Sequence, residues 1–305
     1  MFSCKTILCS YNGERYIIEQ ILSINGSFKM ANSVEFSIDI FDDGSLDNTY
    51  EKVRSLQSEL PQGILNFHCG ENKGVVGNFL NAIVSVDTDT IDWVFLSDQD
   101  DVWVENKVLE YFHVFLKVNS NIPALVFSDS SLIDAEGQIY NPSFFSYQGL
   151  NVNVLDDDSI LFRNCVQGAT IALNKSMVLL LKKSLEKVSV DEIVMHDWWL
   201  AILAKYYGEY YFINKSLIYY RQHDKNEIGA KNKKNKLLSI FVSPGKYINS
   251  IKLVCNQVKS FMIFYNYYNN KSMFSNKKAL TVNHCGLIKK IFVKVIEVCF
   301  FRKLS

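Results

Sequence analysis

Short apolar runs alternate with amphipathic stretches through the first 130 residues, and this alternation constrains the fold more than any other feature of the chain. The apolar runs have the length of β-strands and lie at Lys5–Cys9, Phe36–Phe41, Ile64–His68, Trp93–Ser97 and Ala124–Phe127. The stretches between them have the spacing of helices and lie at Glu14–Ile24, Asp47–Leu56, Val76–Val84 and Asn106–Val118. Strands that alternate with helices of this length form crossover units. We therefore predict an α/β fold with a Rossmann-like, mostly parallel sheet flanked by helices.

The pattern loosens over residues 128–164 and becomes regular again afterwards. The later elements that we expect are strands at Gly168–Leu173, Tyr210–Ile213 and Leu217–Tyr220, and helices near Ser176–Leu185 and Asp197–Tyr207. A basic, Asn-rich linker then lies around residues 225–236. It predicts two parts, a domain over residues 1–228 and a basic helical extension over residues 229–305.

The formal net charge of zero conceals a strong asymmetry along the chain. Residues 225–305 contain 16 Lys and Arg against two acids, a balance of +14, so the remaining residues carry a balance of −14. Such asymmetry favours two surfaces with different partners. The seven cysteines are odd in number and form no Cys-x-x-Cys pair, which favours reduced thiols in a cytoplasmic protein. No uncharged run of 18 residues is present, so we expect no membrane-spanning helix.

Three carboxylates follow the apolar run Trp93–Ser97 within four positions, at Asp98, Asp100 and Asp101. Like charges this close repel, so a folded protein keeps them together only with a cation or with hydrogen-bond donors. Oxygen ligands at the carboxyl end of a strand suit a divalent ion that also binds a phosphate. The alternative is a solvated acidic loop, but polar clusters at equivalent strand ends favour the metal site.

Three of those clusters lie at neighbouring strand ends, where an open α/β sheet binds ligands. Tyr11 carries a ring that can stack on a base, and a carboxylate such as Asp43 can accept hydrogen bonds from a base or a ribose. Lys73 lies in the third loop, where it can approach a phosphate. Taken singly, these clusters also fit capped turns and an ordinary exposed lysine.

Two later clusters contain candidates for proton transfer and metal binding. Asp197 opens an apolar helix and precedes two tryptophans, so burial can raise its pKa as a general base requires. The alternative is that Asp197 is only the N-cap of that helix. His223 follows Arg221 after a strand and is a candidate metal ligand, with Arg221 as a phosphate clamp. The alternative for this histidine is a solvated side chain beside a basic linker.

Taken together, six clusters resemble, in order and spacing, those of the family 2 inverting glycosyltransferases with the type A fold. The clusters are Ser10-Tyr11-Asn12-Gly13, Asp42-Asp43-Gly44-Ser45, Asn72-Lys73-Gly74, Asp98-Gln99-Asp100-Asp101, His196-Asp197-Trp198-Trp199 and Tyr220-Arg221-Gln222-His223. The forms around the aspartates and around His-Asp-Trp-Trp are similar in particular to bacterial rhamnosyltransferase-like members. The resemblance covers about residues 3–228 and leaves the extension unmatched.

The resemblance implies a metal-dependent transfer, with inversion, of rhamnose or another hexose from a nucleoside-diphosphate donor. The donor would be linked to dTDP or UDP. The acceptor would be a hydroxyl of a glycan or of a lipid-linked oligosaccharide, in the synthesis of a bacterial surface polysaccharide. No enzyme nucleophile is required for such a transfer, and the sequence contains no Gly-x-Ser-x-Gly motif.

The resemblance also implies the residues that bind the nucleotide. Tyr11 and Asp43 would hold the base, with Cys9, Asn12 and Lys73 beside them. Cys9 departs from the family pattern, because a hydroxyl residue such as Thr is more usual there. A side-chain hydrogen bond from this position is therefore not expected.

Metal binding and catalysis fall to a second group in the same resemblance. Asp98 would contact the ribose or the metal, and Asp100 would bind Mg²⁺ or Mn²⁺ bridging the diphosphate. His223 would approach the metal and the diphosphate. Asp197 would deprotonate the acceptor hydroxyl, and the strand at Gly168–Leu173 would form the floor of the acceptor site.

Two other classes of function fit parts of the sequence. A metal-dependent phosphohydrolase or nucleotidyltransferase also uses clustered aspartates, but it leaves the His-Asp-Trp-Trp cluster without a role. A non-catalytic glycan-binding protein would bind a glycan without a nucleotide. We expect no nucleic-acid partner, because a sheet edge lined with carboxylates repels phosphate backbones.

The basic extension can carry a helix that lies on a membrane surface. On a helical projection of residues 287–299, apolar side chains share one face and lysines occupy the other, and five aromatic residues lie at 261–268. This pattern is typical of a helix at an anionic membrane interface, where it would hold a cytoplasmic enzyme near a lipid-linked acceptor. The alternative is a helix that packs on the preceding domain or on a partner subunit.

Overall fold

The protein is an α/β structure with helices on both faces of one mixed sheet, described here from a computed structural model of residues 2–32, 34–223, 244–270, 273, 279–286, 290 and 293–294. Its strands are β1 Phe2–Ser10, β2 Val34–Asp42, β3 Leu65–Cys69, β4 Trp93–Ser97, β5 Val102–Trp103, β6 Ala124–Ile133, β7 Ile139–Asn141, β8 Ala172–Asn174 and β9 Glu209–Arg221. Its α-helices are α1 Ile17–Met30, α2 Thr49–Gln57, α3 Gly74–Ser85, α4 Lys107–Phe115, α5 Phe144–Gln148, α6 Lys175–Leu185, α7 His196–Tyr207 and α9 Pro244–Asn269. Single 3₁₀ turns lie at η1 Val152–Leu155, η2 Asp158–Leu161, η3 Gly168–Thr170 and η4 Val190–Glu192.

The sheet has the strand order β3-β2-β1-β4-β8-β6-β9-β5, with β7 beside β6. The first four strands of that order are parallel, and their register places Ser10 opposite Asp42. Because parallel strands end at the same edge, the polar clusters after β1, β2 and β4 meet there. β8 then enters antiparallel to both β4 and β6, and β9 is again parallel to β6. The predicted α/β fold is confirmed, with its parallel character confined to two parts of a mixed sheet.

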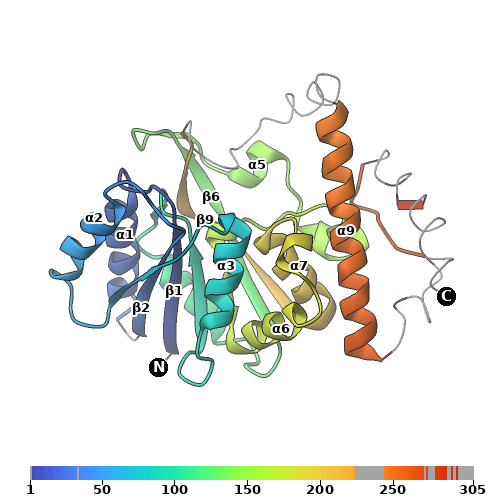
Figure 1. Ribbon diagram of the computed structural model, residues 1–305, viewed down its shortest axis with the longest axis horizontal. Helices are drawn as coiled ribbons and strands as arrows, with labels where there is room; N and C mark the ends of the chain where they lie inside the picture. Colours follow the sequence, from blue (N-terminus) through green and yellow to red (C-terminus); the bar gives the residue numbers. More distant parts are fainter. Residues whose placement is uncertain are drawn as a thin grey trace.

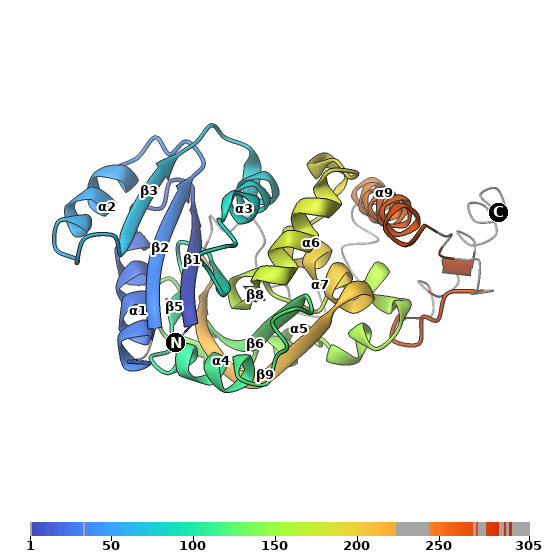
Figure 2. The same ribbon diagram turned by 90° about the horizontal axis from the view of Figure 1, so that it is seen from below.

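Both faces of the sheet are covered, which explains the nearly continuous apolar runs in the sequence. Along β4, Val94 and Leu96 pack into the core under α3, α6 and α7, whereas Phe95 packs into the core under α1, α2 and α4. Figures 1 and 2 show these two groups of helices on opposite faces of the sheet. Alternate side chains of a strand point to opposite faces, so a strand between two helical layers is apolar at every position.

Two parts of the second half differ from the prediction. The predicted strand Gly168–Leu173 overlaps β8 Ala172–Asn174 only at its last two residues, because Gly168–Thr170 forms the 3₁₀ turn η3. The two strands predicted at 210–213 and 217–220 are one long strand, β9. The register of β9 relative to β6 shifts near the polar residues 214–216, which lie between the two predicted strands. In the sequence, polar residues at such an irregularity look like a turn.

The described part of the extension starts at α9, which lies beside α6 and α7 at the end of the molecule away from β3 (Figures 1 and 2). Phe261 and Phe264 are fully buried, and they contact Trp199 and Tyr207 of α7. These two aromatic side chains therefore pack on the preceding domain, whereas Tyr267 stays exposed. Most of the amphipathic pattern at 287–299 lies outside the described residues. Within the described part of the chain, no helix is long and apolar enough to span a bilayer.

Candidate active site

A cavity of about 460 Å³ opens at the edge of the sheet where the polar clusters meet. Its wall contains Cys9, Tyr11, Asp43, Asp98, Asp100 and Asp197 from the sequence prediction. It also contains polar residues to which the sequence had assigned no function, namely Asn78, Gln99, Asn164, Gln167, His196 and Tyr220. The first group comes mainly from the ends of β1, β2 and β4, and most of the second group comes from α3, the 164–168 loop and α7. Both halves of the chain therefore form this cavity.

Asp43 fixes one end of the cavity to the start of α3. Its carboxylate accepts hydrogen bonds from the backbone N–H groups of Lys73 at 2.8 Å and Gly74 at 2.9 Å. Gly74 has a φ of +70°, which favours glycine at this turn. The neighbouring Asp42 instead accepts hydrogen bonds from Ser10 and Ser45. Asp43 is therefore the member of this acidic pair that faces the cavity.

Two residues predicted to bind the nucleotide are not in the wall of this cavity. Asn12 adopts a φ of 49°, and its side-chain oxygen accepts a hydrogen bond from the backbone of Leu46. Lys73 contributes its backbone N–H to Asp43 and borders a smaller, adjoining hollow. The structure thus gives Asn12 a role in shaping the turn, and it places Lys73 beside the main cavity.

Gln99 links the loops that follow β1 and β4. Its amide oxygen accepts a hydrogen bond from the Tyr11 backbone N–H at 2.9 Å, and its amide nitrogen donates to the Tyr11 carbonyl at 3.0 Å. A Cβ at Gly13 would lie 2.2 Å from the Gln99 side-chain oxygen, so a larger residue there would displace the Gln99 amide. In the sequence, the position of Gln99 between Asp98 and Asp100 was the only signal for a role at the site. Both edges of its amide are satisfied, so Gln99 holds the Tyr11 backbone, and the Tyr11 side chain is exposed.

Asp98 and Asp100 line the cavity, whereas the third carboxylate points away from it. Asp101 is completely buried and accepts the backbone N–H of Arg221 at 3.1 Å. Burial raises the pKa of Asp101 well above its ordinary value, and the charges of Asp100 and Asp98 raise it further. The two cavity carboxylates therefore lie close to a third that serves the fold.

His223 and Arg221 both lie behind Asp100. His223 Nε2 lies 2.7 Å from Asp100 Oδ2, and the imidazole stacks on Tyr16. Arg221 is buried, donates to the Asp100 carbonyl at 2.9 Å and pairs with Glu19 at 2.7 Å. The interpretation of Arg221 as a phosphate clamp is wrong, because its guanidinium is held away from the cavity.

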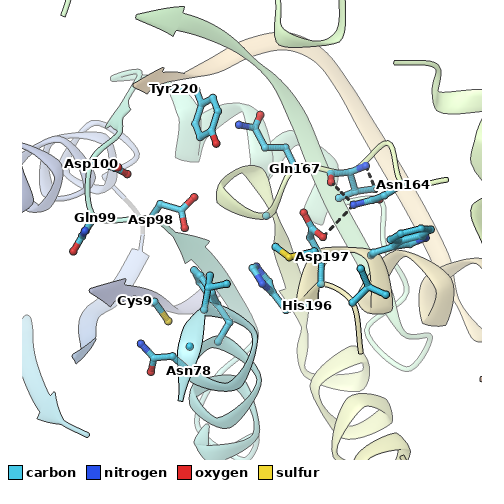
Figure 3. A pocket seen from close by; sticks show the side chains of 18 of the residues that line it. Cys9, Asn78, Asp98, Gln99, Asp100, Asn164, Gln167, His196, Asp197 and Tyr220 are labelled. Carbon is cyan, nitrogen blue, oxygen red and sulfur yellow. Dashed lines mark hydrogen bonds between the residues drawn. The ribbon is translucent and has the colours of Figure 1, made fainter. Parts of the chain in front are cut away.

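Asp197 lies on the opposite wall, in the first turn of α7. The N-cap of this helix is Met195, so the interpretation of Asp197 as a cap is wrong. Burial raises the pKa of Asp197 to about 7, and the backbone N–H groups of Trp198 and Gly168 and the amide of Asn164 oppose that rise. Asn164 Nδ2 donates to Asp197 Oδ1 at 3.0 Å, and Figure 3 shows this contact at the cavity wall. A carboxylate that changes charge near neutral pH is suited to proton transfer.

His196 lines the cavity beside Asp197 as a neutral ring. It stacks on Phe79 with ring centroids 4.1 Å apart, and burial lowers the pKa of His196 to about 3. A Cβ at Gly168 would lie 2.7 Å from His196 Nε2, so a larger residue at Gly168 would require the imidazole to move.

Comparison with known proteins agrees with this geometry. Residues 6–128 match the family model described as Glycosyl transferase family 2. The dTDP-rhamnosyl transferase RfbG of Shigella flexneri is 30% identical over 228 residues, which are 73% of this chain and 74% of that protein.

Solved structures extend the likeness of fold over most of the chain. Residues 1–349 of S. aureus TarS, in complex with UDP-GlcNAc, match with a TM-score of 0.54 and 16% identity, over 94% of this chain and 77% of that chain. Glucosyl-3-phosphoglycerate synthase from Mycobacterium tuberculosis, in complex with Mn²⁺, UDP and glucosyl-3-phosphoglycerate, matches with a TM-score of 0.50 and 12% identity, over 85% of this chain and 80% of that chain. The type A fold is confirmed, and the chain belongs to glycosyl transferase family 2.

Proposed function

We propose that this family 2 glycosyltransferase moves rhamnose from a dTDP-linked donor to a hydroxyl of a glycan or lipid-linked oligosaccharide, with inversion. One observation carries the proposal: Asp98 and Asp100 face Asp197 across a single cavity (Figure 3). A displacement of this kind needs a stabilised leaving group on one side of the sugar and a base on the other. The 30% identity to a dTDP-rhamnosyl transferase supports the choice of nucleotide and sugar.

The proposed reaction has one displacement step. Asp197 accepts the proton of the acceptor hydroxyl, whose oxygen forms a bond to C1 of the sugar. The bond between C1 and the diphosphate oxygen breaks with its electron pair, so C1 inverts. General-base catalysis of this kind contributes roughly 10²–10⁴-fold.

The cysteines in the cavity support a mechanism without an enzyme nucleophile. Burial raises the pKa of the Cys165 thiol to about 12 and that of Cys9 well above its ordinary value. The carboxylates of Asp98 and Asp43 raise the pKa of Cys9 further. The nucleophilic form of cysteine is the thiolate, so at neutral pH neither side chain attacks the sugar.

The residues at the carboxylate end fit a divalent metal ion. Asp98 and Asp100 offer hard oxygen ligands, and both line the same cavity. No group of three or more His, Cys, Asp or Glu side chains forms a metal cage within the described residues. Mg²⁺ is usually held by one or two carboxylates and completed by substrate phosphates. We propose that Asp98 and Asp100 would hold Mg²⁺ or Mn²⁺ and that His223 would orient Asp100. When bound, such an ion would supply positive charge for the departing diphosphate.

Calorimetric titration with dTDP and with UDP, each with and without Mn²⁺, tests the proposed function. We expect dTDP to bind the wild-type protein, and we expect Mn²⁺ to strengthen that binding. Stronger binding of UDP would change the donor to a UDP-sugar. Failure of both nucleotides to bind folded protein would contradict the proposal.

Asn164→Ala is expected to move the acid limb of the pH–rate profile upwards by about one pH unit. The Asn164 amide donates to Asp197 and so favours the ionised form that acts as base. A hydrogen bond to a charged group contributes about 1.5–3 kcal/mol, and one pH unit corresponds to 1.36 kcal/mol. The measurement is kcat/KM against pH from 5 to 9. A rate that falls by the same factor at every pH would assign Asn164 a structural role alone.

A further inference from the structure

Gln167 has an amide group that is engaged at one edge only. The residue is 8% exposed and lines the cavity between Asn164 and the turn η3. Its side-chain oxygen accepts a hydrogen bond from the Ser130 hydroxyl at 2.7 Å. Its side-chain nitrogen has no hydrogen-bond partner within the part of the chain that the structure describes. Ser130 is completely buried in β6, so it holds the amide in one orientation.

Two other amides of the cavity, those of Gln99 and Asn164, are engaged within the protein. Gln99 bonds the Tyr11 backbone at both edges, and Asn164 bonds Asp197 and the Val166 backbone. A buried N–H without a partner costs free energy, and native proteins keep few of them. A donor left open in a cavity wall is therefore a candidate contact for the molecule that enters the cavity.

The position of Gln167 in the cavity indicates which part of a bound substrate its side-chain nitrogen would contact. Its chain neighbour Gly168 donates a backbone N–H to Asp197, and Figure 3 shows the Gln167 side chain between Asn164 and Tyr220. Tyr220 follows Tyr219, which pairs with Val102 of β5 directly after the acidic cluster, so Tyr220 lies near the carboxylate end. Gln167 therefore faces the space between the leaving-group side and the base side, which the transferred sugar would occupy in the proposed reaction.

We propose that Gln167 Nε2 donates a hydrogen bond to a hydroxyl of the donor hexose and that Ser130 orients the amide for this contact. The proposal rests on the proposed function and adds a residue that distinguishes sugars. A site built to bond a hydroxyl discriminates against sugars that lack the hydroxyl or carry its epimer, because the buried donor is then left unpaired.

The test measures the gain in affinity that the sugar adds to the nucleotide. Calorimetry gives dissociation constants for dTDP and for dTDP-rhamnose with wild-type protein, Gln167→Met and Gln167→Glu. Both variants lack the N–H donor, and methionine has a similar size. We expect each variant to bind dTDP as wild type does and to bind dTDP-rhamnose about tenfold or more weakly. Unchanged dTDP binding also shows that the variants are folded.

Gln257 offers a matched control. It is fully buried, its side-chain oxygen accepts the Val194 N–H at 2.8 Å, and its side-chain nitrogen also has no partner among the described residues. It lies on α9 and is not in the cavity wall. We expect Gln257→Met to leave the affinity for dTDP-rhamnose relative to dTDP unchanged.

The remaining outcomes overturn the assignment in distinguishable ways. If wild-type protein binds dTDP and both Gln167 variants keep the full gain from the sugar, Gln167 does not contact the donor hexose. A rise in the acceptor KM alone, with donor affinity unchanged, would move the contact to the acceptor and likewise overturn the proposal. If wild-type protein binds neither dTDP nor UDP, the proposed function itself fails.

Discussion

Asp197→Asn is expected to reduce the rate of sugar transfer by roughly 10²–10⁴-fold, while the affinity for dTDP stays close to that of wild type. Asparagine has nearly the same shape as aspartate but cannot accept the acceptor proton. The nucleotide is expected at the opposite wall, beside Asp43 and Asp98, so its contacts are retained. Single-turnover transfer and calorimetry with dTDP measure the two quantities. Parallel loss of transfer and of nucleotide affinity would place Asp197 in nucleotide binding and remove the base assignment.

The same substitution is expected to stabilise the fold above pH 7. The Asp197 pKa is raised from 3.8 to about 7, so the folded state binds this proton more tightly than the unfolded state does. Wild-type stability therefore falls as the pH rises from about 4 to 7, and the cost of the buried charge is complete above pH 7. At 1.36 kcal/mol per unit, asparagine removes a cost of about 4 kcal/mol. Thermal unfolding at pH 8.5 should show the gain, and unfolding at pH 4 should show little of it.

Asp100→Ala is expected to abolish the Mn²⁺-dependent part of nucleotide binding and, with it, transfer. The substitution removes one of the two carboxylates that face the diphosphate side of the cavity, and it also leaves His223 without its 2.7 Å contact. Metal-independent binding through Asp43 and Tyr11 should remain. The measurement is calorimetry with dTDP with and without Mn²⁺.

Asp89→Ala is a suitable control for that experiment, because Asp89 is exposed and lies before the opposite end of β4. It should retain the full effect of Mn²⁺. If Asp100→Ala also retains it, the ion is bound elsewhere and the role of Asp98 and Asp100 must be reassigned.

The first half of the fold was easiest to predict at its central strand, because burial on both faces makes β4 apolar at nearly every position. Val94, Phe95 and Leu96 are buried against two different helical layers, and this leaves a run that is easily recognised. The second half could not be predicted in the same way. β6 continues through Ser128, Asp129 and other polar residues that are buried and hydrogen-bonded, so its sequence resembles a loop.

The charged residues of the candidate site could be predicted from the sequence, whereas its amide side chains could not. Asp98, Asp100 and Asp197 stand out in the sequence because clustering or burial of carboxylates is energetically unfavourable and so indicates a compensating ligand or a function. Asn164 and Gln167 lie in an irregular loop, and only the three-dimensional structure shows that one bonds Asp197 and the other faces the cavity. Asn12 shows the opposite case, because a residue in a recognised cluster serves the turn and not the cavity wall.

The reversal of strand direction between β4 and β8 divides the sheet into two sides that supply different residues of the cavity. Asp43, Asp98 and Asp100 follow strands of the parallel side and lie within residues 6–128, which match the family model. Asn164, Gln167 and Asp197 belong to the other side. The two sides also meet away from the cavity, because β9 pairs with β5 and Arg221 of β9 donates to the Asp100 carbonyl and pairs with Glu19. The late strand β9 therefore holds the early acidic loop in place, so the cavity takes its shape only when both halves of the chain fold together.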